Sequence, residues 1–420
     1  MLSLPMASRD PRGISLIDSL FTSTSAVCVT GLTVKDTALS FSPFGRWVIF
    51  VLFQMGGLGI MTFSTLFAVM LGRKIGFYET DVISSTLDKR NIVGLKKLIF
   101  YILAITLTCE TLGAFSLFLR WKTTMGWGMF ETIEKAVFHS VSAFCNAGFS
   151  LFTASLSQFK EDPYVSFIMM TLIFLGGIGF IVIMDVIGLF YKRGVERRIS
   201  LQSKVALSVS FCLVILGAFF LFFFEKDKLM SMMSAPQKIW NSFFQSITAR
   251  TAGFNTLSIG QLSAPSMMVM MFLMFIGASP GSTGGGIKTC TFAVLIAAIF
   301  AMVKNKKRVV CFKRSIPRQV IREALVIFFL AITWIFIFTL LIAFFQRDIS
   351  FIRALFEVVS AFGTVGLSTG VTSTLNSLSK LCIIVTMFAG RVGPLTLALA
   401  VAFREREDKY TFPEENIMVG

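Results

Sequence analysis

Val29-Thr30-Gly31-Leu32 is the first of four short tetrads that decide the fold of this chain. The others align with it without gaps: Asn146-Ala147-Gly148-Phe149, Thr251-Ala252-Gly253-Phe254 and Thr364-Val365-Gly366-Leu367. Each tetrad follows a short segment of helical character, and these segments cover about 15–28, 131–145, 237–249 and 350–362. A long apolar run comes after every copy. Four equivalent elements in one chain can close around a single axis, so we expect a fourfold arrangement.

The composition is typical of an integral membrane protein. The 420 residues are 55% hydrophobic and only 15% charged, and the mean hydropathy is +0.78. A net charge of +16 is compatible with nucleic-acid binding, but the basic residues do not form one face of a folded domain. They occupy three polar breaks: Arg73, Lys74, Lys89, Arg90, Lys96, Lys97; Lys192, Arg193, Arg197, Arg198, Lys204; and Lys304, Lys306, Lys307, Arg308, Lys313, Arg314, Arg318, Arg322. This is positive-inside topology, which predicts a multi-pass protein with these loops in the cytoplasm, surrounded by lipid and binding no nucleic acid.

The order of segments repeats between the basic loops. Outer helices are expected at roughly 98–119, 205–224 and 324–345, and second helices at roughly 44–71, 164–190, 266–303 and 379–403. The predicted fold is an all-α integral membrane protein with four pseudo-repeats of helix, pore loop and helix around one central pore. The repeats are 1–75 (truncated, with pore loop 15–36 and an inner helix), 76–200, 201–315 (with a broken gating helix) and 316–420 (with a cytoplasmic C-terminal tail).

The first repeat has no outer helix before its pore loop, whereas the other three each have one. We therefore expect that the first outer helix is missing ahead of Met1, through a late start or a truncated gene. A genuine seven-span protein is the alternative.

The tetrads have the residues that a cation selectivity filter needs. A monovalent cation inside a membrane must replace its hydration shell, and backbone carbonyls are a neutral substitute. Turning successive carbonyls inward requires backbone angles that are open mainly to glycine. The preceding short helices would point their negative C-terminal ends at the cavity. The predicted K⁺ ligands are the carbonyls of Val29, Thr30, Gly31, Asn146, Ala147, Gly148, Thr251, Ala252, Gly253, Thr364, Val365 and Gly366, and the single glycines predict a K⁺ preference that is not strict.

A glycine-rich segment, residues 277–288, interrupts the second helix of the third repeat. Its five glycines and one proline are incompatible with a stable helix, so we expect a loop across the path below the filter that acts as a gate. The segment superficially resembles a phosphate-binding loop, but Ile287 occupies the position of the required lysine and no strand precedes it. The candidate gate residues are Gly277, Gly281, Gly284, Gly285, Gly286, Lys288 and Arg391.

Several intramembrane polar residues need partners. Arg391 is costly in hydrocarbon, and carbonyls of the broken loop, Glu110 or Asp185 are candidates to bind it. Arg391 then acts as a barrier to ions or only ties the loop to the fourth repeat. Glu110 and Asp185 line the pore or, as we favour, serve as ion-pair partners. His139 is expected to be a satisfied structural residue, and Arg250 to brace the filter from behind.

The four tetrads, the broken helix and Gly390-Arg391-Val392-Gly393-Pro394-Leu395-Thr396 together resemble the Trk/Ktr/HKT superfamily of potassium transporters. The resemblance covers nearly the whole chain and is strongest to the bacterial KtrB type of membrane subunit. It implies a location in the bacterial plasma (inner) membrane. It also implies a filter role for Gly31, Gly148, Gly253 and Gly366, a gating role for 277–288 and a barrier role for Arg391. The missing first outer helix departs from the family pattern.

The same resemblance implies partners. Relatives of this type form homodimers and sit on a cytosolic ring of nucleotide-binding regulatory subunits of the KtrA type. This chain has no soluble nucleotide-binding domain in its sequence, so no cofactor is expected in it. Control by ATP, ADP or a dinucleotide would come through the partner, docked on the side of the basic loops and of the tail after Phe403.

Three functions remain open from the sequence. The first is potassium uptake driven by the membrane potential, which supplies about 2.3 kcal/mol per charge per 100 mV. The second is a Na⁺-selective or Na⁺-coupled relative, because single-glycine filters discriminate less sharply. The third is a secondary active ion carrier, although such carriers commonly have inverted repeats and these four run in the same sense. An enzyme is the weakest reading, because no nucleophile–base pair is evident and the seven Cys and one His show no metal-binding spacing.

Overall fold

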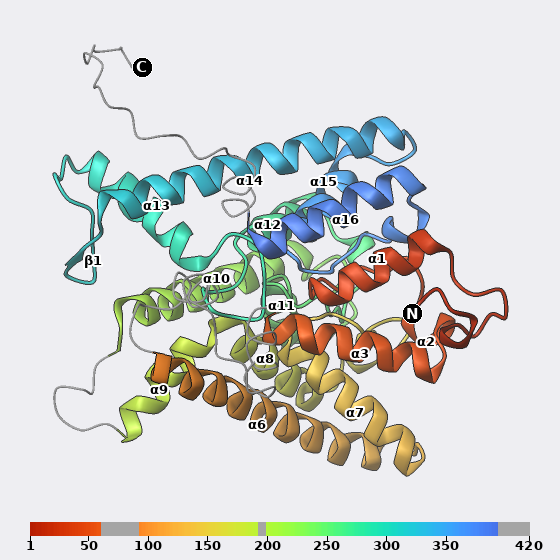
Figure 1. Ribbon diagram of the computed structural model, residues 1–420. Helices are drawn as coiled ribbons and strands as arrows, with labels where there is room; N and C mark the ends of the chain where they lie inside the picture. The colour runs from red at the N-terminus through yellow and green to blue at the C-terminus, as the bar shows by residue number, and fades with distance from the viewer. Residues whose placement is uncertain (60–91, 192–198, 394–420) are drawn as a thin grey trace.

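The computed structural model describes residues 1–59, 92–191 and 199–393 (Figure 1), and this part of the chain is predominantly helical. Most of the first two basic clusters, the ends of the predicted helices 44–71 and 379–403, and the C-terminal tail lie outside the described residues. The helices are α1 (Leu16–Val27), α2 (Thr37–Ser40), α3 (Pro43–Leu58), α6 (Ile92–Thr124), α7 (Met129–Phe144), α8 (Pro163–Ile178), α9 (Phe180–Tyr191), α10 (Leu201–Glu225), α11 (Ala235–Thr248), α12 (Ala264–Phe275), α13 (Thr289–Val303), α14 (Arg318–Phe345), α15 (Phe351–Phe362) and α16 (Ser377–Val392).

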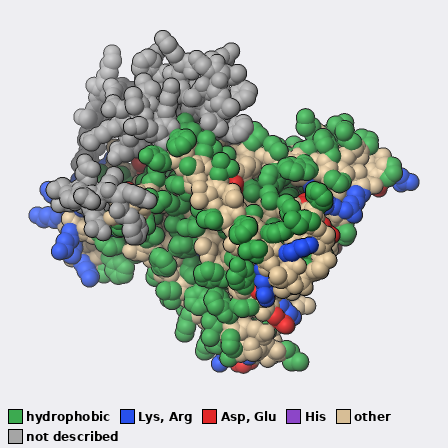
Figure 2. Space-filling model, turned by 90° about the horizontal axis from the view of Figure 1, so that it is seen from below, with side chains coloured by type: hydrophobic (Ala, Val, Ile, Leu, Met, Phe, Trp, Pro, Cys, Tyr) green, Lys and Arg blue, Asp and Glu red, His purple; other side chains and the backbone are tan. Residues whose placement is uncertain are grey.

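Three of these helices are long and apolar enough to cross a membrane. They are α6, α10 and α14, and the bent pair α8 and α9 adds a fourth span if the two are counted together. In Figure 1, α6 and α14 lie along opposite edges of the molecule and α10 lies between them. Hydrophobic side chains are widespread on the described part of the face in Figure 2. Such a surface suits a hydrocarbon environment.

The short and second helices pack in a cycle. Each second helix contacts the short helix of the following copy: α3 contacts α7, α8 contacts α11, and α12 contacts α15. The cycle is closed because α16 contacts α1, although these helices lie at opposite ends of the sequence. An ion pair fastens this last contact, with 2.6 Å between Lys380 Nζ and Asp18 Oδ1. The cyclic packing brings the segments after all four short helices toward one place.

The outer helices are tied to the starts of the second helices by side chains. In each case a residue at the end of the outer helix bonds the residue that caps the second helix. The pairs are Arg120–Asp162 (2.9 Å), Glu225–Ser263 (2.9 Å to the backbone N–H) and Gln346–Asn376 (3.0 Å). The contacts to Ser263 and Asn376 satisfy N–H groups that a helix start leaves unpaired, and all three contacts fix the second helices relative to the outer ones.

The second helices are shorter than the sequence predicts. The expected continuous helix over 164–190 is wrong, because α8 ends at Ile178 and α9 leaves it at an angle of 100°. The break lies at Gly179, whose φ of 93° terminates an α-helix. Gly59 (φ 86°) and Gly393 (φ 95°) end α3 and α16 in the same way. A glycine break therefore recurs at equivalent places.

A small hairpin corrects the all-α expectation. Strands β1 (Val310–Cys311) and β2 (Arg314–Ser315) pair antiparallel within the third basic segment. Phe312 and Lys313 form the turn, with φ values of 48° and 63°. A two-residue turn with both φ values positive matches the twist of a hairpin, but it usually contains Asn or Gly. The absence of those residues at the turn left no sequence signal for it.

Candidate functional site

Each tetrad begins immediately after a short helix, in a left-handed backbone conformation. The first residues have φ values of 55° (Val29), 58° (Asn146), 77° (Thr251) and 50° (Thr364). Val29, Thr251 and Thr364 are β-branched residues, which rarely adopt positive φ, so the arrangement is strained in three copies, whereas Asn146 tolerates it in the second. The glycines are evident in the sequence but this conformation is not, because Val and Thr carry no signal for a left-handed backbone.

The four tetrad glycines lie together in a closed ring. A Cβ placed on Gly31 would lie 2.8 Å from the Cα of Gly148, and one on Gly148 would lie 3.3 Å from that of Gly253. The corresponding distances are 3.2 Å from Gly253 to Gly366 and 3.0 Å from Gly366 back to Gly31. All four have positive φ, between 70° and 92°. Both the conformation and the lack of space therefore favour glycine at these positions.

Carbonyl oxygens of the tetrads surround this ring. The oxygen nearest to each added Cβ belongs to the second residue of a neighbouring tetrad: Ala147 for Gly31, Ala252 for Gly148, Val365 for Gly253 and Thr30 for Gly366. The second residues of all four tetrads are buried. The structure thus brings the glycines and the second residues of the four tetrads together, with backbone oxygens as the polar atoms closest to the ring.

A hydroxyl group near the end of each short helix holds its tetrad. Ser25 Oγ accepts from the N–H of Gly31 (3.1 Å), and Ser360 Oγ accepts from the N–H of Gly366 (3.2 Å). In the other two copies the hydroxyl donates to the carbonyl that follows the glycine. These bonds are Ser142 to Phe149 (2.8 Å) and Thr248 to Phe254 (2.6 Å). A Ser or Thr recurs at this place in every copy of the sequence, but the backbone group that it binds is set only by the fold.

The glycine-rich segment is a loop between α12 and α13, as its composition predicts. A bridge between Ile276 and Ile287 closes its base. The loop touches the fourth tetrad, because the N–H of Gly285 donates to Thr364 Oγ1 (2.9 Å). It also touches the third tetrad, since a Cβ on Gly284 would meet the Thr251 hydroxyl. Gly277 and Gly286 lie against each other at the base, and Gly281, with φ 70°, lies next to Ile181 of α9.

The two predicted cations of the gate both bind carbonyl oxygens. The Arg391 guanidinium donates to the carbonyl of Thr283 in the loop and to the carbonyl of Gly56 near the end of α3. Lys288 Nζ donates to the carbonyl of Gly284 (2.7 Å). Arg391 therefore joins the fourth copy, the loop and the first copy below the glycine ring.

Glu110 and Asp185, expected as ion-pair partners, bind uncharged groups in the described part of the chain. Among the described residues neither carboxylate is in an ion pair. Glu110 accepts from the side-chain amide of Gln54 (3.2 Å), and Asp185 accepts from Ser203 Oγ (2.6 Å) and the Ser200 N–H. The breaks in the helices supply carbonyls next to Arg391, so the guanidinium is satisfied without either acid.

Arg250 and His139 differ in how they match expectation. Arg250 donates to the carbonyls of Ser210 in α10 (3.3 Å) and Gly277 (3.4 Å). Its guanidinium thus anchors the base of the loop, and its bracing of the filter stays a prediction. The structural assignment of His139 is confirmed, because it is fully buried and both ring nitrogens have partners.

Comparison with known proteins identifies relatives over the whole chain. The family model described as TrkH, cation transport protein, matches residues 3–411. The potassium/sodium uptake protein NtpJ of Enterococcus hirae is 38% identical over 100% of this chain and 93% of its own length. The Ktr system potassium uptake proteins B of Vibrio alginolyticus and Bacillus subtilis are 38% and 37% identical over 100% of this chain, covering 91% and 93% of their own lengths.

A solved structure has the same fold. The crystal structure of the potassium transporter TrkH from Vibrio parahaemolyticus superposes with a TM-score of 0.72 at 21% identity. The match covers 96% of this chain and 81% of that one. At this identity the likeness concerns the fold.

Proposed function

The chain belongs to the TrkH family of cation transport proteins, which are transporters and not enzymes, and on that premise we propose that it is the pore-forming subunit of a bacterial potassium uptake system. The names of relatives that are 37–38% identical over the full chain support this substrate. Its place is the plasma membrane, which its apolar spanning helices would cross several times.

The observation that carries the proposal is the ring of Gly31, Gly148, Gly253 and Gly366 with backbone oxygens around it. A K⁺ ion has to lose its water to pass, and carbonyl dipoles compensate it without binding it as tightly as carboxylates would. Irregular backbone is tolerated at membrane depth where it lines a water-filled path. The filter consists of the first three residues of each tetrad. The segments 1–75, 76–200, 201–315 and 316–420 act as four pseudo-repeats around it.

The gate is the loop 277–288 together with Arg391 and Lys288. In this proposal the loop lies across the path and its two cations raise a barrier to K⁺. Arg391 holds the loop by hydrogen bonds to carbonyls on two sides, and Thr364 holds Gly285 from the filter side. Conduction requires these contacts to break together, after which the loop moves aside.

A sodium-linked function is the second candidate. One relative, similar over the whole chain, is named a potassium/sodium uptake protein. Each tetrad has one glycine, so fewer well-formed carbonyl sites are available to separate the two ions. Transport of Na⁺, or stimulation of K⁺ transport by Na⁺, would follow.

Partners complete the proposal. Two relatives are named as proteins of a Ktr system. We expect this chain to form a homodimer that docks, through its cytoplasmic face, on a KtrA-type ring of nucleotide-binding subunits. The basic segment 304–322, which contains the hairpin, would offer positive charge on that face. Nucleotide control would come through the ring, with no cofactor in this chain.

Uptake of radioactive Rb⁺ into liposomes that contain the purified chain tests the function directly. Rb⁺ uptake should exceed that of empty liposomes, respond to an imposed inside-negative potential, and be inhibited more by external K⁺ than by Na⁺. Growth at low K⁺ of a bacterium lacking its own K⁺ uptake should be restored. Uptake no faster than in empty liposomes, with correctly folded protein, would refute the proposal.

A further inference from the structure

All four short helices carry a buried polar side chain at an equivalent position. It lies nine residues before the tetrad glycine in three copies, and eight before it in the third copy, which is one residue shorter. These residues are Thr22, His139, Gln245 and Glu357, each at most 1% exposed. A buried polar group in an apolar protein requires a hydrogen-bond partner, so each must serve a specific bond.

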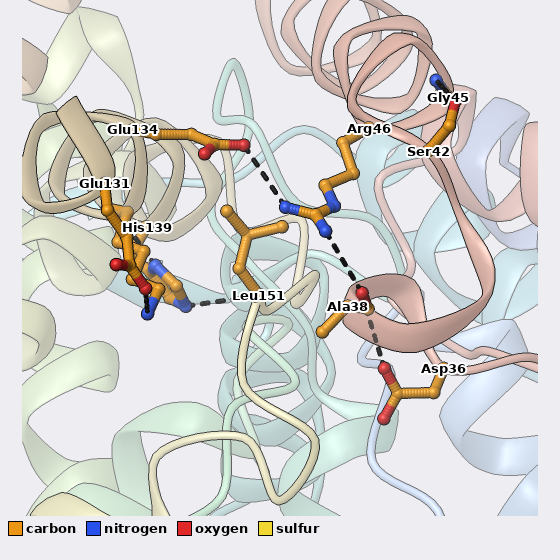
Figure 3. A network of polar contacts seen from close by, with 10 residues as sticks. Asp36, Ala38, Ser42, Gly45, Arg46, Glu131, Glu134, His139 and Leu151 are labelled. Carbon is orange, nitrogen blue, oxygen red and sulfur yellow. Dashed lines mark hydrogen bonds and ion pairs between the residues drawn. The ribbon is translucent and has the colours of Figure 1, made fainter. Parts of the chain in front are cut away.

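In three copies this side chain accepts from the same backbone amide. The donor is the N–H of the third residue after the tetrad glycine. Two of the bonds are Leu151 to His139 Nε2 (3.3 Å) and Thr369 to Glu357 Oε1 (2.8 Å). Once the side-chain amide of Gln245 is turned so that its oxygen faces the N–H donors, Oε1 accepts from Thr256 (3.2 Å) and also from Leu257 (3.1 Å). Figure 3 shows the bond between His139 and Leu151. Three chemically different side chains thus make one equivalent contact.

The hydrogen bonds around His139 define the tautomer of its imidazole ring. Nδ1 lies 2.7 Å from the carbonyl of Lys135, which can only accept, so Nδ1 carries the hydrogen. Nε2 is then the unprotonated nitrogen of a neutral ring. It accepts from the N–H of Leu151 and from the hydroxyl of Ser150 (3.0 Å). His139 therefore acts as an acceptor toward the chain after the second tetrad.

Glu357 makes the most extensive contact of the three. Its Oε1 accepts from Ser368 Oγ (2.8 Å), from the N–H of Thr369 and from Thr369 Oγ1 (3.0 Å), and its Oε2 accepts from Thr372 Oγ1 (2.5 Å). Among the described residues no Lys or Arg pairs with this carboxylate. One side chain thereby holds residues 368–372, the segment that leaves the fourth tetrad.

The first copy differs from the others. Thr22 Oγ1 donates to the carbonyl of Asp18 one turn earlier in its own helix (2.8 Å). A threonine hydroxyl used in this way makes its hydrogen bond within its own helix and binds no described residue after the tetrad. The equivalent position in the first copy thus offers a natural control for the other three.

We propose that His139, Gln245 and Glu357 are positioning residues that fix the backbone just after the tetrads in sequence and so set the K⁺/Na⁺ preference of the pore. This inference rests on the proposed function. The chain after each glycine lacks a helix or strand to pair its amides, so the side-chain acceptor determines where it lies. In the second, third and fourth copies the helix-end hydroxyl binds at the tetrad glycine or the next residue, and the acceptor binds the third residue after the glycine. A displacement at either contact moves the carbonyls that discriminate between cations.

The test compares leucine and conservative variants in the Rb⁺ uptake assay, with K⁺ and Na⁺ as competing ions. His139→Leu, Gln245→Leu and Glu357→Leu remove the acceptor at similar size, and each should lower the K⁺/Na⁺ preference by about tenfold, because a buried amide is left unpaired. His139→Gln and Glu357→Gln keep an acceptor and should retain the wild-type ratio. Thr22→Val, at the matched position, should also retain it.

Melting temperature and yield of folded protein are measured in parallel, because a purely structural role would lower these without changing the ratio. If a leucine variant does not fold, Gln245→Asn withdraws the acceptor by one methylene group and should lower the ratio, whereas Gln245→Glu should not. Folded variants that transport with the wild-type ratio would overturn the inference. Wild-type protein without K⁺ transport would instead overturn the proposed function.

Discussion

Replacing the ring glycines by alanine, one at a time, should damage K⁺ selectivity to an extent that the structure ranks. Gly366 is the most crowded position, since its added Cβ would overlap the Thr30 carbonyl and lie 3.0 Å from the Cα of Gly31. Gly148 is the least crowded, with its nearest atoms at 2.9 to 3.3 Å. We therefore expect Gly366→Ala to be more severe than Gly148→Ala.

Two effects contribute to the magnitude. A side chain in the left-handed region costs about 1 kcal/mol, and both glycines have φ in that region. Forcing a methyl group into a packed site costs about 1–3 kcal/mol more, which applies in full to Gly366. Gly126 separates the two effects: its φ is 63° and its Cβ would meet nothing within 4 Å. Gly126→Ala should therefore show only the cost of the left-handed backbone and no steric cost.

The assay is Rb⁺ uptake in liposomes with K⁺ or Na⁺ competition, with melting temperature measured for each variant. Gly366→Ala should lose most of its K⁺/Na⁺ preference, Gly148→Ala should lose part of it, and Gly126→Ala should keep it despite a slightly lower melting temperature. Folded Gly366→Ala protein with wild-type preference would show that the ring does not select the ion.

The remaining predictions concern the gate and the closure of the cycle. Thr364→Val removes the acceptor for the Gly285 amide, which is worth about 1 kcal/mol, so Rb⁺ uptake should rise severalfold without loss of selectivity; slower or unchanged uptake would contradict this. Arg391→Gln removes the fixed charge and weakens the hold on the loop, so uptake should rise further, and a fall would argue for a purely structural arginine. Asp18→Asn removes the charge that pairs with Lys380 and should lower the free energy of unfolding by about 1 kcal/mol in a chemical denaturation experiment, whereas a change near zero would mean that the pair is solvated.

Sequence patterns predicted the short helices and the interrupted helix well, because both signals are local. The four tetrads have a fixed spacing to the preceding helices, and five glycines with one proline between Gly277 and Lys288 prevent a helix regardless of tertiary context. The structure places loop residues 276–288 between α12 and α13, close to the expected range.

The remaining features depend on contacts between distant residues. A glycine such as Gly179 within an apolar run is compatible with a continuous helix, and only the loop packed against it determines that the chain turns by 100°. The partners of Arg391 were ambiguous for the same reason, because carbonyls freed by breaks in other helices are invisible in the sequence. The positioning role of Gln245 required knowledge of which amide faces it.

Direct observation of bound ions tests the central claim most directly. A structure of the protein in Rb⁺ or Tl⁺, with anomalous scattering to identify the ions, should show a cation on the axis of the ring formed by Gly31, Gly148, Gly253 and Gly366. Its ligands should be carbonyl oxygens of the tetrads. Ordered ions found only away from this ring, with none among the tetrad carbonyls, would contradict the account.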